Sequence, residues 1–365
     1  MKKLLFIILT FSTLCANAQY LTTHAKNIDC KEVAGVYYYL PRTTMKIQFT
    51  IQETMQHIGP FAEYAQTLLG TKDYISEEKK VVEIKNVSVE TMSETDPNAV
   101  FFVYNDEKSR EQGSFKFIFE GNGVISGFGI DNVIDNNNNE NIFMYDSAPD
   151  IEEVKFIDFI ADEEEDEDEF EGAPKKLTKE DKARMAVEKI TKIRTAYFEL
   201  ISGFQEVNYG SSIVDMQNRL KELEYEYLSL FKGKKSVITY QKTVFITPEK
   251  TMLGNETVIA KIIDNEGFAS PNVKGGEGVK LSFQTDNLSK HVKEISRDDI
   301  ENGVFSNKLF YRIPEQVKMK LTFKNKTIFE TNMVISQFGN FVLIPMNNYK
   351  LVFDSENGSI KSISK

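Results

Sequence analysis

Cysteine is scarce in this chain: only Cys15 and Cys30 occur in 365 residues. Cys15 falls within an N-terminal segment that we expect to be removed, so Cys30 would be the one thiol of the mature protein. A lone cysteine cannot form an internal disulfide, and stability must then come from packing. We interpret Cys30 as a half-buried, small apolar residue and not as a catalytic thiol.

Tryptophan is absent, and the only histidines are His24, His57 and His291. The lack of tryptophan disfavours a carbohydrate-stacking surface. No histidine lies in an HExxH or His-x-His pattern, so a zinc site has little support. The GxSxG, GxxxxGK[ST] and CxxC motifs are also missing. A serine hydrolase could still use His57 or His291, because triads assemble from distant residues, but neither histidine is accompanied by a nucleophile motif.

Long hydrophobic runs are missing as well. The run Leu4 to Leu9 follows a basic head and is too short to span a bilayer, and no later run replaces it. Ala16-Asn17-Ala18 then gives a small-x-small site, which predicts a signal peptide over residues 1–18 with cleavage between Ala18 and Gln19. Lipidation at Cys15 is the alternative, but Leu14 stands where lipoprotein processing needs a small residue. We therefore expect a periplasmic protein, with outer-membrane association or cell-surface display as the alternative.

The sequence has fewer basic residues than acidic ones, 44 Lys and Arg against 55 Asp and Glu. The formal net charge is −11 and becomes more negative when Lys2 and Lys3 leave with the signal peptide. Such acidity disfavours nucleic acid and anionic lipid surfaces as partners. The remaining length is sufficient for two or three domains with proper cores.

Residues 19–160 are predicted to form a β-rich domain. Residues 35–40 read as a strand that Pro41 ends, and Met45, Ile47, Phe49 and Ile51 then alternate as one buried face of a second strand. Gly59-Pro60 and Gly70 bound a short helix over residues 60–69. Further strands are predicted at residues 81–91, 99–104, 114–119 and 124–130.

Two motifs in this segment resemble a known family. Tyr39-Leu40-Pro41-Arg42-Thr43, followed by Gly59-Pro60-Phe61-Ala62-Glu63-Tyr64-Ala65, is similar to an uncharacterised family of exported Bacteroidetes proteins with a domain of unknown function. The resemblance implies a phylum and a compartment. It implies no activity and no site residue.

Polar segments separate this domain from the next. Residues 161–176 contain eight consecutive carboxylates, Asp162 to Glu169, and we expect a solvated acidic linker. The run lacks the spacing of a calcium loop, and so does the asparagine-rich stretch 135–141. Asp146-Ser147-Ala148 resembles the sequon at which Bacteroidetes glycosylate exported proteins, which makes Ser147 a possible O-glycosylation site.

Residues 177–233 are predicted to form an antiparallel helical hairpin. Thr178 with Asp181 can cap the first helix, and Ser212 with Asp215 can start the second. Each helix carries an apolar stripe with steps of three and four, which indicates that the two helices bury each other. The stripes are Ala186, Ile190, Ile193, Tyr197, Leu200 and Phe204, and Ile213, Met216, Leu220, Leu223, Tyr227 and Leu230. The hairpin either packs on a sheet or protrudes to bind a partner.

Residues 234–365 read as many short strands without intervening helices, which favours an antiparallel β-sandwich. Asn325, between the strands 317–323 and 327–335, suggests a hairpin turn. The predicted fold class is therefore α+β and mostly β: an N-terminal β-rich domain, a central helical hairpin and a C-terminal sandwich.

No catalytic, cofactor-binding or metal-ligating residue can be named from these patterns. We predict a non-enzymatic exported envelope protein, a binding or accessory factor whose partner is another envelope protein. The alternative is a periplasmic hydrolase of carbohydrate or peptide, with a carboxylate site that the sequence does not reveal.

Overall fold

The computed structural model describes residues 20–29, 33–105, 116–129, 154–157, 177–202, 212–285, 291–346 and 349–364. Over these residues the chain is mostly β, with antiparallel sheets, as predicted. The predicted signal peptide with its Ala18–Gln19 cleavage site, Cys30, the asparagine-rich stretch, Ser147 and the acidic linker lie outside the described residues. No described helix has the length and apolar character needed to cross a membrane.

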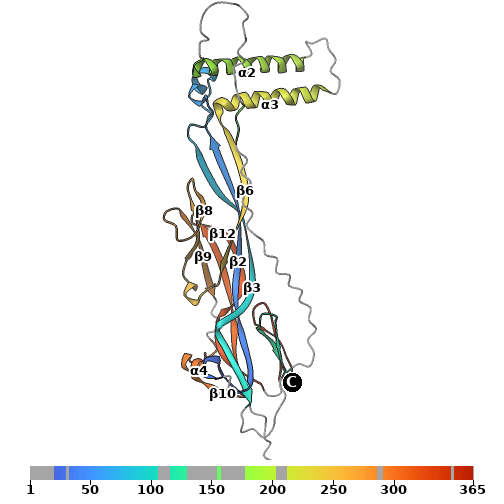
Figure 1. Cartoon of the computed structure of the whole chain (residues 1–365), viewed down its shortest axis with the longest axis vertical. Helices are drawn as coiled ribbons and strands as arrows, with labels where there is room; N and C mark the ends of the chain where they lie inside the picture. The colour runs from blue at the N-terminus through green and yellow to red at the C-terminus, as the bar shows by residue number, and fades with distance from the viewer. Residues whose placement is uncertain are drawn as a thin grey trace, which may run out of the picture.

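The molecule is elongated, with two helices at one end and sheets along the rest (Figure 1). The first sheet has the order β10-β1-β3-β2-β6. Its strands are β1 (Tyr20–His24), β2 (Gly35–His57), β3 (Lys79–Asn105), β6 (Lys234–Ile246) and β10 (Val304–Ser306). β2 and β3 pair antiparallel along almost their whole length, and they form the long axis of the protein.

The second sheet has the order β12-β11-β9-β7-β8. Its strands are β7 (Thr257–Ile263), β8 (Gly267–Ala269), β9 (Glu277–Thr285), β11 (Lys308–Phe323) and β12 (Lys326–Pro345). The predicted hairpin at Asn325 is confirmed, because Phe323 pairs with Lys326. Lys324 and Asn325 both have positive φ, 48° and 60°, as a two-residue hairpin turn of the primed type requires.

The third sheet has the order β14-β13-β5-β4 and mixes strands from the two ends of the chain. Its strands are β4 (Phe117–Phe119), β5 (Ile125–Phe128), β13 (Lys350–Phe353) and β14 (Ile360–Ser364). The predicted division into a separate N-terminal domain and C-terminal sandwich is therefore not confirmed. Strands from before residue 160 and after residue 233 share both the first sheet and this one.

Pro41 does not end a strand, contrary to the prediction. β2 continues through it, with a register shift against β3 between Tyr39 and Pro41. Proline has no N–H to donate and is tolerated where a ladder is interrupted or one side of a strand is open. β6 pairs with β2 only from Met45 onward, so Pro41 lies outside that ladder.

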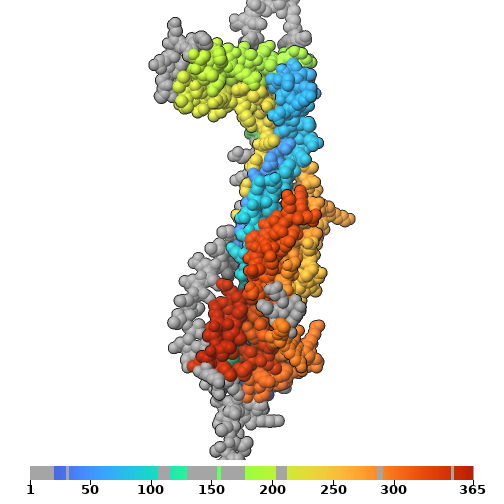
Figure 2. Space-filling view, turned by 180° about the vertical axis from the view of Figure 1, so that it is seen from behind, coloured from blue at the N-terminus to red at the C-terminus, as the bar shows by residue number. Residues whose placement is uncertain are grey.

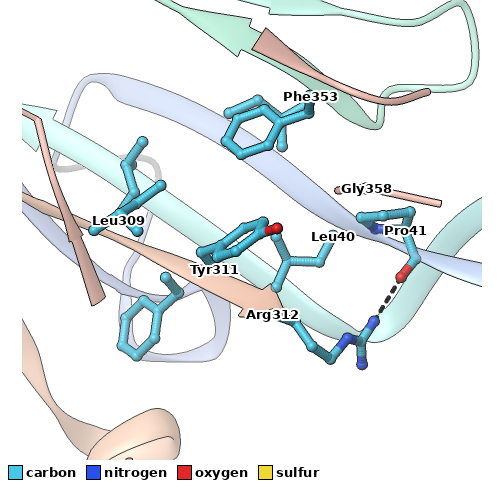
Figure 3. Close-up of a pocket in the computed structure, with 10 residues that line it drawn as sticks. Leu40, Pro41, Leu309, Tyr311, Arg312, Phe353 and Gly358 are labelled. Carbon is cyan, nitrogen blue, oxygen red and sulfur yellow. Dashed lines mark hydrogen bonds between the residues drawn. The ribbon is translucent and has the colours of Figure 1, made fainter. Parts of the chain in front are cut away.

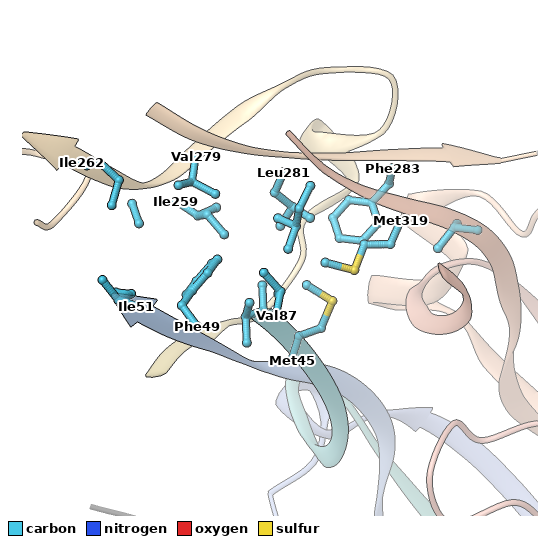
Figure 4. Close-up of a cluster of buried hydrophobic side chains, with 14 of the residues drawn as sticks. Met45, Phe49, Ile51, Val87, Ile259, Ile262, Val279, Leu281, Phe283 and Met319 are labelled. Carbon is cyan, nitrogen blue, oxygen red and sulfur yellow. The ribbon is translucent and has the colours of Figure 1, made fainter. Parts of the chain in front are cut away.

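Four long strands, β2, β3, β11 and β12, run through two separate hydrophobic cores. The middle core lies between the first two sheets, where Met45, Phe49 and Ile51 face Leu281 and Phe283 (Figure 4). The lower core contains Tyr38, Phe101, Phe128, Phe310 and Leu351, among others. The predicted alternation from Met45 to Ile51 is confirmed, since the four apolar members are fully buried.

Helices occupy one end of the molecule, which we call the head. It contains the 3-10 turn η2 (Ala62–Tyr64) and the helices α1 (Ala65–Leu69), α2 (Lys179–Ser202) and α3 (Ser212–Lys232). Thr178 caps α2 as predicted: its Oγ1 accepts from the Asp181 N–H, and the Asp181 carboxylate accepts from the Thr178 N–H.

Three further short helical elements lie elsewhere: η1 (Ala25–Asn27), η3 (Lys250–Met252) and α4 (Arg297–Asn302). α4 differs from the prediction that no helix intervenes among the C-terminal strands. Ser296 caps it, with its side chain accepting from the Asp299 N–H, and six residues are too few to show an apolar period.

Candidate functional site

The inner halves of α2 and α3 build a small core of their own, which we call the head core. Ala183, Ala186 and Ile190 of α2 are fully buried against Leu230 and Phe231 of α3. Phe61 and Ala65 close this core from the side of η2 and α1. The spacing of three and four on α2 places its buried residues on one face, so the inner half of the helix is fixed by packing.

A narrow neck joins the head to the sheets. It consists of the ends of three strands, residues 54–57 of β2, 79–81 of β3 and 234–237 of β6. Figure 2 shows the head set off from the wider lower part of the molecule. The Phe61 N–H donates to the Leu230 carbonyl at 2.8 Å, and the Ile75 N–H donates to the Lys232 carbonyl at 2.9 Å.

Glycine makes this junction possible. Gly233 has φ +83°, and a Cβ placed there would lie 2.3 Å from the His57 carbonyl oxygen. A Cβ on Gly59 would lie at the same distance from the Leu230 carbonyl oxygen. Backbones approach this closely only where side chains are absent. Close main-chain contacts therefore fix the position of the head relative to the neck.

Beyond the head core, Leu200 of α2 is also buried, and polar groups join the two helices. Arg194 Nε lies 2.7 Å from Glu224 Oε1, and the Lys221 ammonium lies 5.5 Å from the centre of the Tyr197 ring. Arg194 precedes Tyr197 on α2, whereas its partner Glu224 follows Lys221, the partner of Tyr197, on α3. The two helices therefore run antiparallel. Residues 203–211, which connect them, lie outside the described residues.

Away from the buried residues of the head core, the two helices leave several apolar side chains in solvent. Ile201 of α2 is 51% exposed, and Val214 and Tyr225 of α3 are 57% and 58% exposed. We call these three residues the outer apolar set; Val214 and Tyr225 are about three helical turns apart and lie on the same face of α3. Exposed apolar side chains gathered on a protruding element are typical of a protein-binding surface, whereas scattered ones need no explanation.

A buried ion pair lies between the middle and lower cores. Arg312 Nη1 is 2.7 Å from Asp96 Oδ2, and Arg312 Nη2 donates to the Pro41 carbonyl at 2.6 Å. Burial lowers the pKa of the Arg312 guanidinium, while the Asp96 carboxylate raises it. The Nε atom of Arg312 has no hydrogen-bond partner among the described residues.

The cavity beside Arg312 is small and mostly apolar. Leu40, Leu309, Tyr311 and Phe353 line it together with Arg312 (Figure 3). Its volume of about 10 Å³ has room for roughly one water molecule. Burial raises the pKa of the Tyr311 phenol to about 12. The cavity is too small for a substrate.

A second buried polar cluster lies where the β8 turn meets the first sheet. The Tyr240 hydroxyl donates to Glu53 Oε1 at 2.6 Å, and the Lys80 ammonium lies 2.7 Å from Glu53 Oε2. Burial raises the pKa of the Tyr240 phenol, and the bond to Glu53 raises it further. Gly267, with φ +106°, lies directly over the carboxylate. Both oxygens of Glu53 are thus paired inside the protein, which is typical of a structural cluster.

One of the three histidines, His57, lies within hydrogen-bond distance of a serine hydroxyl. His57 Nε2 lies 3.1 Å from Ser236 Oγ in the neck, but among the described residues no hydrogen bond joins His57 to a carboxylate. His24 accepts from the Lys26 N–H through Nδ1, and burial lowers the pKa of its imidazole. His291 begins the segment before α4 and is exposed, and no hydrogen bond or ion pair joins it to another described residue.

No metal site is indicated in the described part of the chain, where no three His, Cys, Asp or Glu side chains cluster. Sequence reasoning did not identify Glu53, Asp96 or Arg312. For Glu53 a usable pattern existed: it is the next inward position after Met45, Ile47, Phe49 and Ile51, and a carboxylate there predicts a buried polar partner.

The chain matches the family described as Domain of unknown function (DUF4831) over residues 34–361. Comparison with curated proteins and with solved structures gave no match.

Proposed function

Since this chain belongs to the DUF4831 family over almost its whole length, we propose that it is a non-enzymatic envelope protein that binds another protein through its projecting helices. The resemblance of its motifs to exported Bacteroidetes proteins supports a periplasmic location in that phylum. Family membership supplies no activity. The proposal is supported by the shape of the molecule and by the chemistry of its exposed side chains.

One observation carries the proposal: within the described part of the chain, the helix pair packs against the rest of the molecule only at its inner end. The head core ends at Ile190 on α2; beyond it the helix continues to Ser202 and has one more buried residue, Leu200. On α3 the buried residues are confined to the last turn, Ser229 to Phe231. In this proposal α2 and α3 are the arms of a helical hairpin joined through residues 203–211, and the outer apolar set contacts the partner.

Export is the second component of the proposal. β1 begins at Tyr20, whose N–H donates to Asn307 Oδ1 at 2.9 Å. Cleavage between Ala18 and Gln19 would therefore leave every described residue in the mature protein. Ser147 would be reachable by an extracytoplasmic glycosylation system in the same compartment.

Site-specific photocrosslinking in cells tests the binding surface. A photoreactive residue at Val214 or Tyr225 should give a crosslinked product of higher mass that contains the same partner at both positions. The matched control is Lys318 on the outer face of the second sheet, which is exposed and far from the head. If positions 214 and 225 gave no product beyond that of position 318, the helix pair would not be the binding surface.

A charge substitution provides the complementary test. Val214→Asp and Tyr225→Asp should abolish capture of the crosslinked partner by the purified protein, because a desolvated carboxylate is costly in an apolar contact. Both side chains are exposed, so the variants should fold normally, which circular dichroism can check. Unchanged capture by both variants would contradict the proposal.

Fractionation with mass analysis of the N-terminus tests export. A periplasmic protein that begins at Gln19 is expected. A chain in the outer-membrane fraction with a lipidated Cys15 would replace the periplasmic assignment by membrane attachment. A cytoplasmic chain that begins at Met1 would contradict export.

A further inference from the structure

The strand β6 forms an unusually long open edge. It lies at the end of the first sheet, and no described strand pairs with its outer side. β6 has thirteen residues, whereas β10, at the opposite edge of the same sheet, has three. Short edge strands are one way in which proteins avoid edge-to-edge pairing, because an edge presents unpaired N–H and C=O groups. β6 lacks that protection.

The side chains of β6 are also suited to strand pairing. From Val237 to Ile246 only one residue, Lys242, carries a charge, and the others are mostly β-branched or aromatic. Val237 and Phe245, which point away from the middle core, are 55% and 61% exposed. The described residues 154–157 lie beside the start of β6, at Lys234, and not along the stretch that begins at Val237.

The order of residues in β6 is nearly symmetric about Gln241. Counting outward from Gln241 in both directions gives four pairs of residues at equal distance from it. They are Tyr240 with Lys242, Thr239 with Thr243, Ile238 with Val244, and Val237 with Phe245. Matched members lie on the same face of the sheet, because side chains alternate with period two.

We propose that β6 pairs antiparallel with β6 of a second copy of this chain, with Gln241 on the two-fold axis. The pairing would join the two first sheets into one continuous sheet. It places Val237 opposite the partner's Phe245 and Thr239 opposite the partner's Thr243. β-branched, aromatic and threonine pairs are the cross-strand combinations that stabilise antiparallel sheets.

Charge supports a second copy in this register. In the register centred on Gln241, no lysine of β6 faces another lysine, and Lys242 faces the partner's Tyr240. Within one chain the Lys242 ammonium already lies 5.8 Å from the Tyr240 ring centre, so this combination is compatible with the inner face. A register centred on Lys242 would place two ammonium groups opposite each other. A register centred on Tyr240 would place Phe245 against Lys235 and Ile238 against Lys242.

Gln241 is suited to the axis position. Its Oε1 accepts from Gln48 Nε2 of the neighbouring strand β2 at 2.6 Å, so the amide lies on the outer face of the sheet. Two symmetry-related amides at the axis can each donate to and accept from the other. A two-fold contact of this kind uses the same surface on both copies and closes on itself.

Light scattering coupled to size exclusion tests the dimer on the intact chain. The wild type should have twice the chain mass, and dilution should yield the monomer. Gln241→Lys would place two ammonium groups at the axis and should weaken association by about tenfold or more. The matched control is Gln52→Lys, which adds the same charge to the outer face of β2, one strand away from the edge.

A monomeric wild type at all concentrations would overturn the proposal, and so would a Gln241→Lys protein that dimerises like the Gln52→Lys protein. Either result would leave the proposed binding by the helix pair untouched, because that surface lies on the head.

Disulfide trapping tests the register. On a Cys15→Ser, Cys30→Ser background, Gln241→Cys should form a disulfide-linked dimer under mild oxidation, because the two positions meet at the axis. Thr239→Cys is the matched control, since it lies on the same face but would be four positions away from its own counterpart. Equal crosslinking of both variants, or crosslinking of Thr239→Cys alone, would contradict the register centred on Gln241.

Discussion

The guanidinium of Arg312 on β11 and the carboxylate of Asp96 on β3 form a buried ion pair, with Nη1 and Oδ2 2.7 Å apart. The side chains are only 6% and 9% exposed. The pair lies where four long strands pass from the middle core to the lower core. It is part of a polar layer in which Gln337 of β12 also binds the backbone of Thr43 from both sides, accepting from its N–H and donating to its carbonyl.

Asp96→Leu should be strongly destabilising. It leaves the Arg312 charge buried without its partner, and loss of one member of a buried pair typically costs about 3–5 kcal/mol. The double variant Asp96→Leu, Arg312→Met should recover most of this loss, because no unpaired charge remains. Urea denaturation measures both.

The exposed pair Lys318–Glu330 serves as the control for this experiment. Glu330→Ala should change the free energy of unfolding by no more than about 1 kcal/mol. A comparably small effect of Asp96→Leu would show that the carboxylate is not needed to hold Arg312.

Gly267→Ala should destabilise the contact between the β8 turn and the first sheet. A Cβ at this position would lie 2.5 Å from Glu53 Oε1 and would also occupy a backbone conformation with φ +106°. Gly254→Ala is the control, because Gly254 also has positive φ, +73°, but no atom lies within 4 Å of its Cβ position. The control should cost about 1 kcal/mol or slightly more, from backbone strain alone.

Thermal unfolding compares the two alanine variants. The excess loss at Gly267 reports the close approach to Glu53 together with the greater backbone strain of φ +106°. If the two variants had equal melting temperatures, the carboxylate would be free to move away, and the cluster of Glu53, Lys80 and Tyr240 would not hold the turn.

Local patterns were sufficient to predict the mostly β fold class and several elements. The period-two run from Met45 to Ile51 identified the buried face of β2, and Asn325 identified the β11–β12 turn. The cap at Thr178 identified the start of α2. Each of these features depends on residues within a few positions of one another, so each can be recognised from the local sequence.

Long-range pairing could not be predicted in the same way. β6 lies beside β2, although β2 ends at His57 and β6 begins at Lys234. β13 lies beside β5, although β5 ends at Phe128 and β13 begins at Lys350. The acidic linker suggested a domain boundary, but composition does not reveal which strands hydrogen-bond across it. Arg312 and Asp96 were missed for the same reason, since a buried charge is recognisable only with its partner.

Alkaline pH should destabilise the protein partly through Tyr311. Its folded-state pKa is raised by burial to about 12, whereas an unfolded tyrosine titrates near 10. Between these values the unfolded chain has lost the proton and the folded chain has kept it. Stability is therefore fully present below about pH 10 and falls as the pH rises, by up to roughly 1.4 kcal/mol per pH unit for one group.

Tyr311→Phe should reduce the pH dependence of the urea midpoint between about pH 10 and pH 12. A residual dependence is expected, because burial also raises the pKa values of Tyr38 and Tyr240. The difference between wild type and variant at pH 8 reports packing alone. If this difference stayed constant up to pH 12, the pH dependence of stability would not come from a raised pKa of Tyr311.

Ile190→Ala should loosen the head without unfolding the sheets. Ile190 is 1% exposed and lies in the head core, which shares no residue with the middle or lower core. Removing a buried isoleucine side chain typically costs about 2–5 kcal/mol, and a core this small has few other contacts to compensate. Because the three-stranded neck is the main connection between the head and the sheets among the described residues, the effect should stay local.

Hydrogen exchange measured by mass spectrometry distinguishes local from global loosening. In Ile190→Ala, exchange should accelerate in α2, α3 and α1, while β2, β9 and β11 keep wild-type protection. Ile47→Ala in the middle core is the matched comparison and should accelerate exchange in those strands instead. Faster exchange in β9 and β11 of the Ile190→Ala protein would mean that the head and the sheets unfold as one cooperative unit. The neck would then couple the stability of the head to that of the sheets.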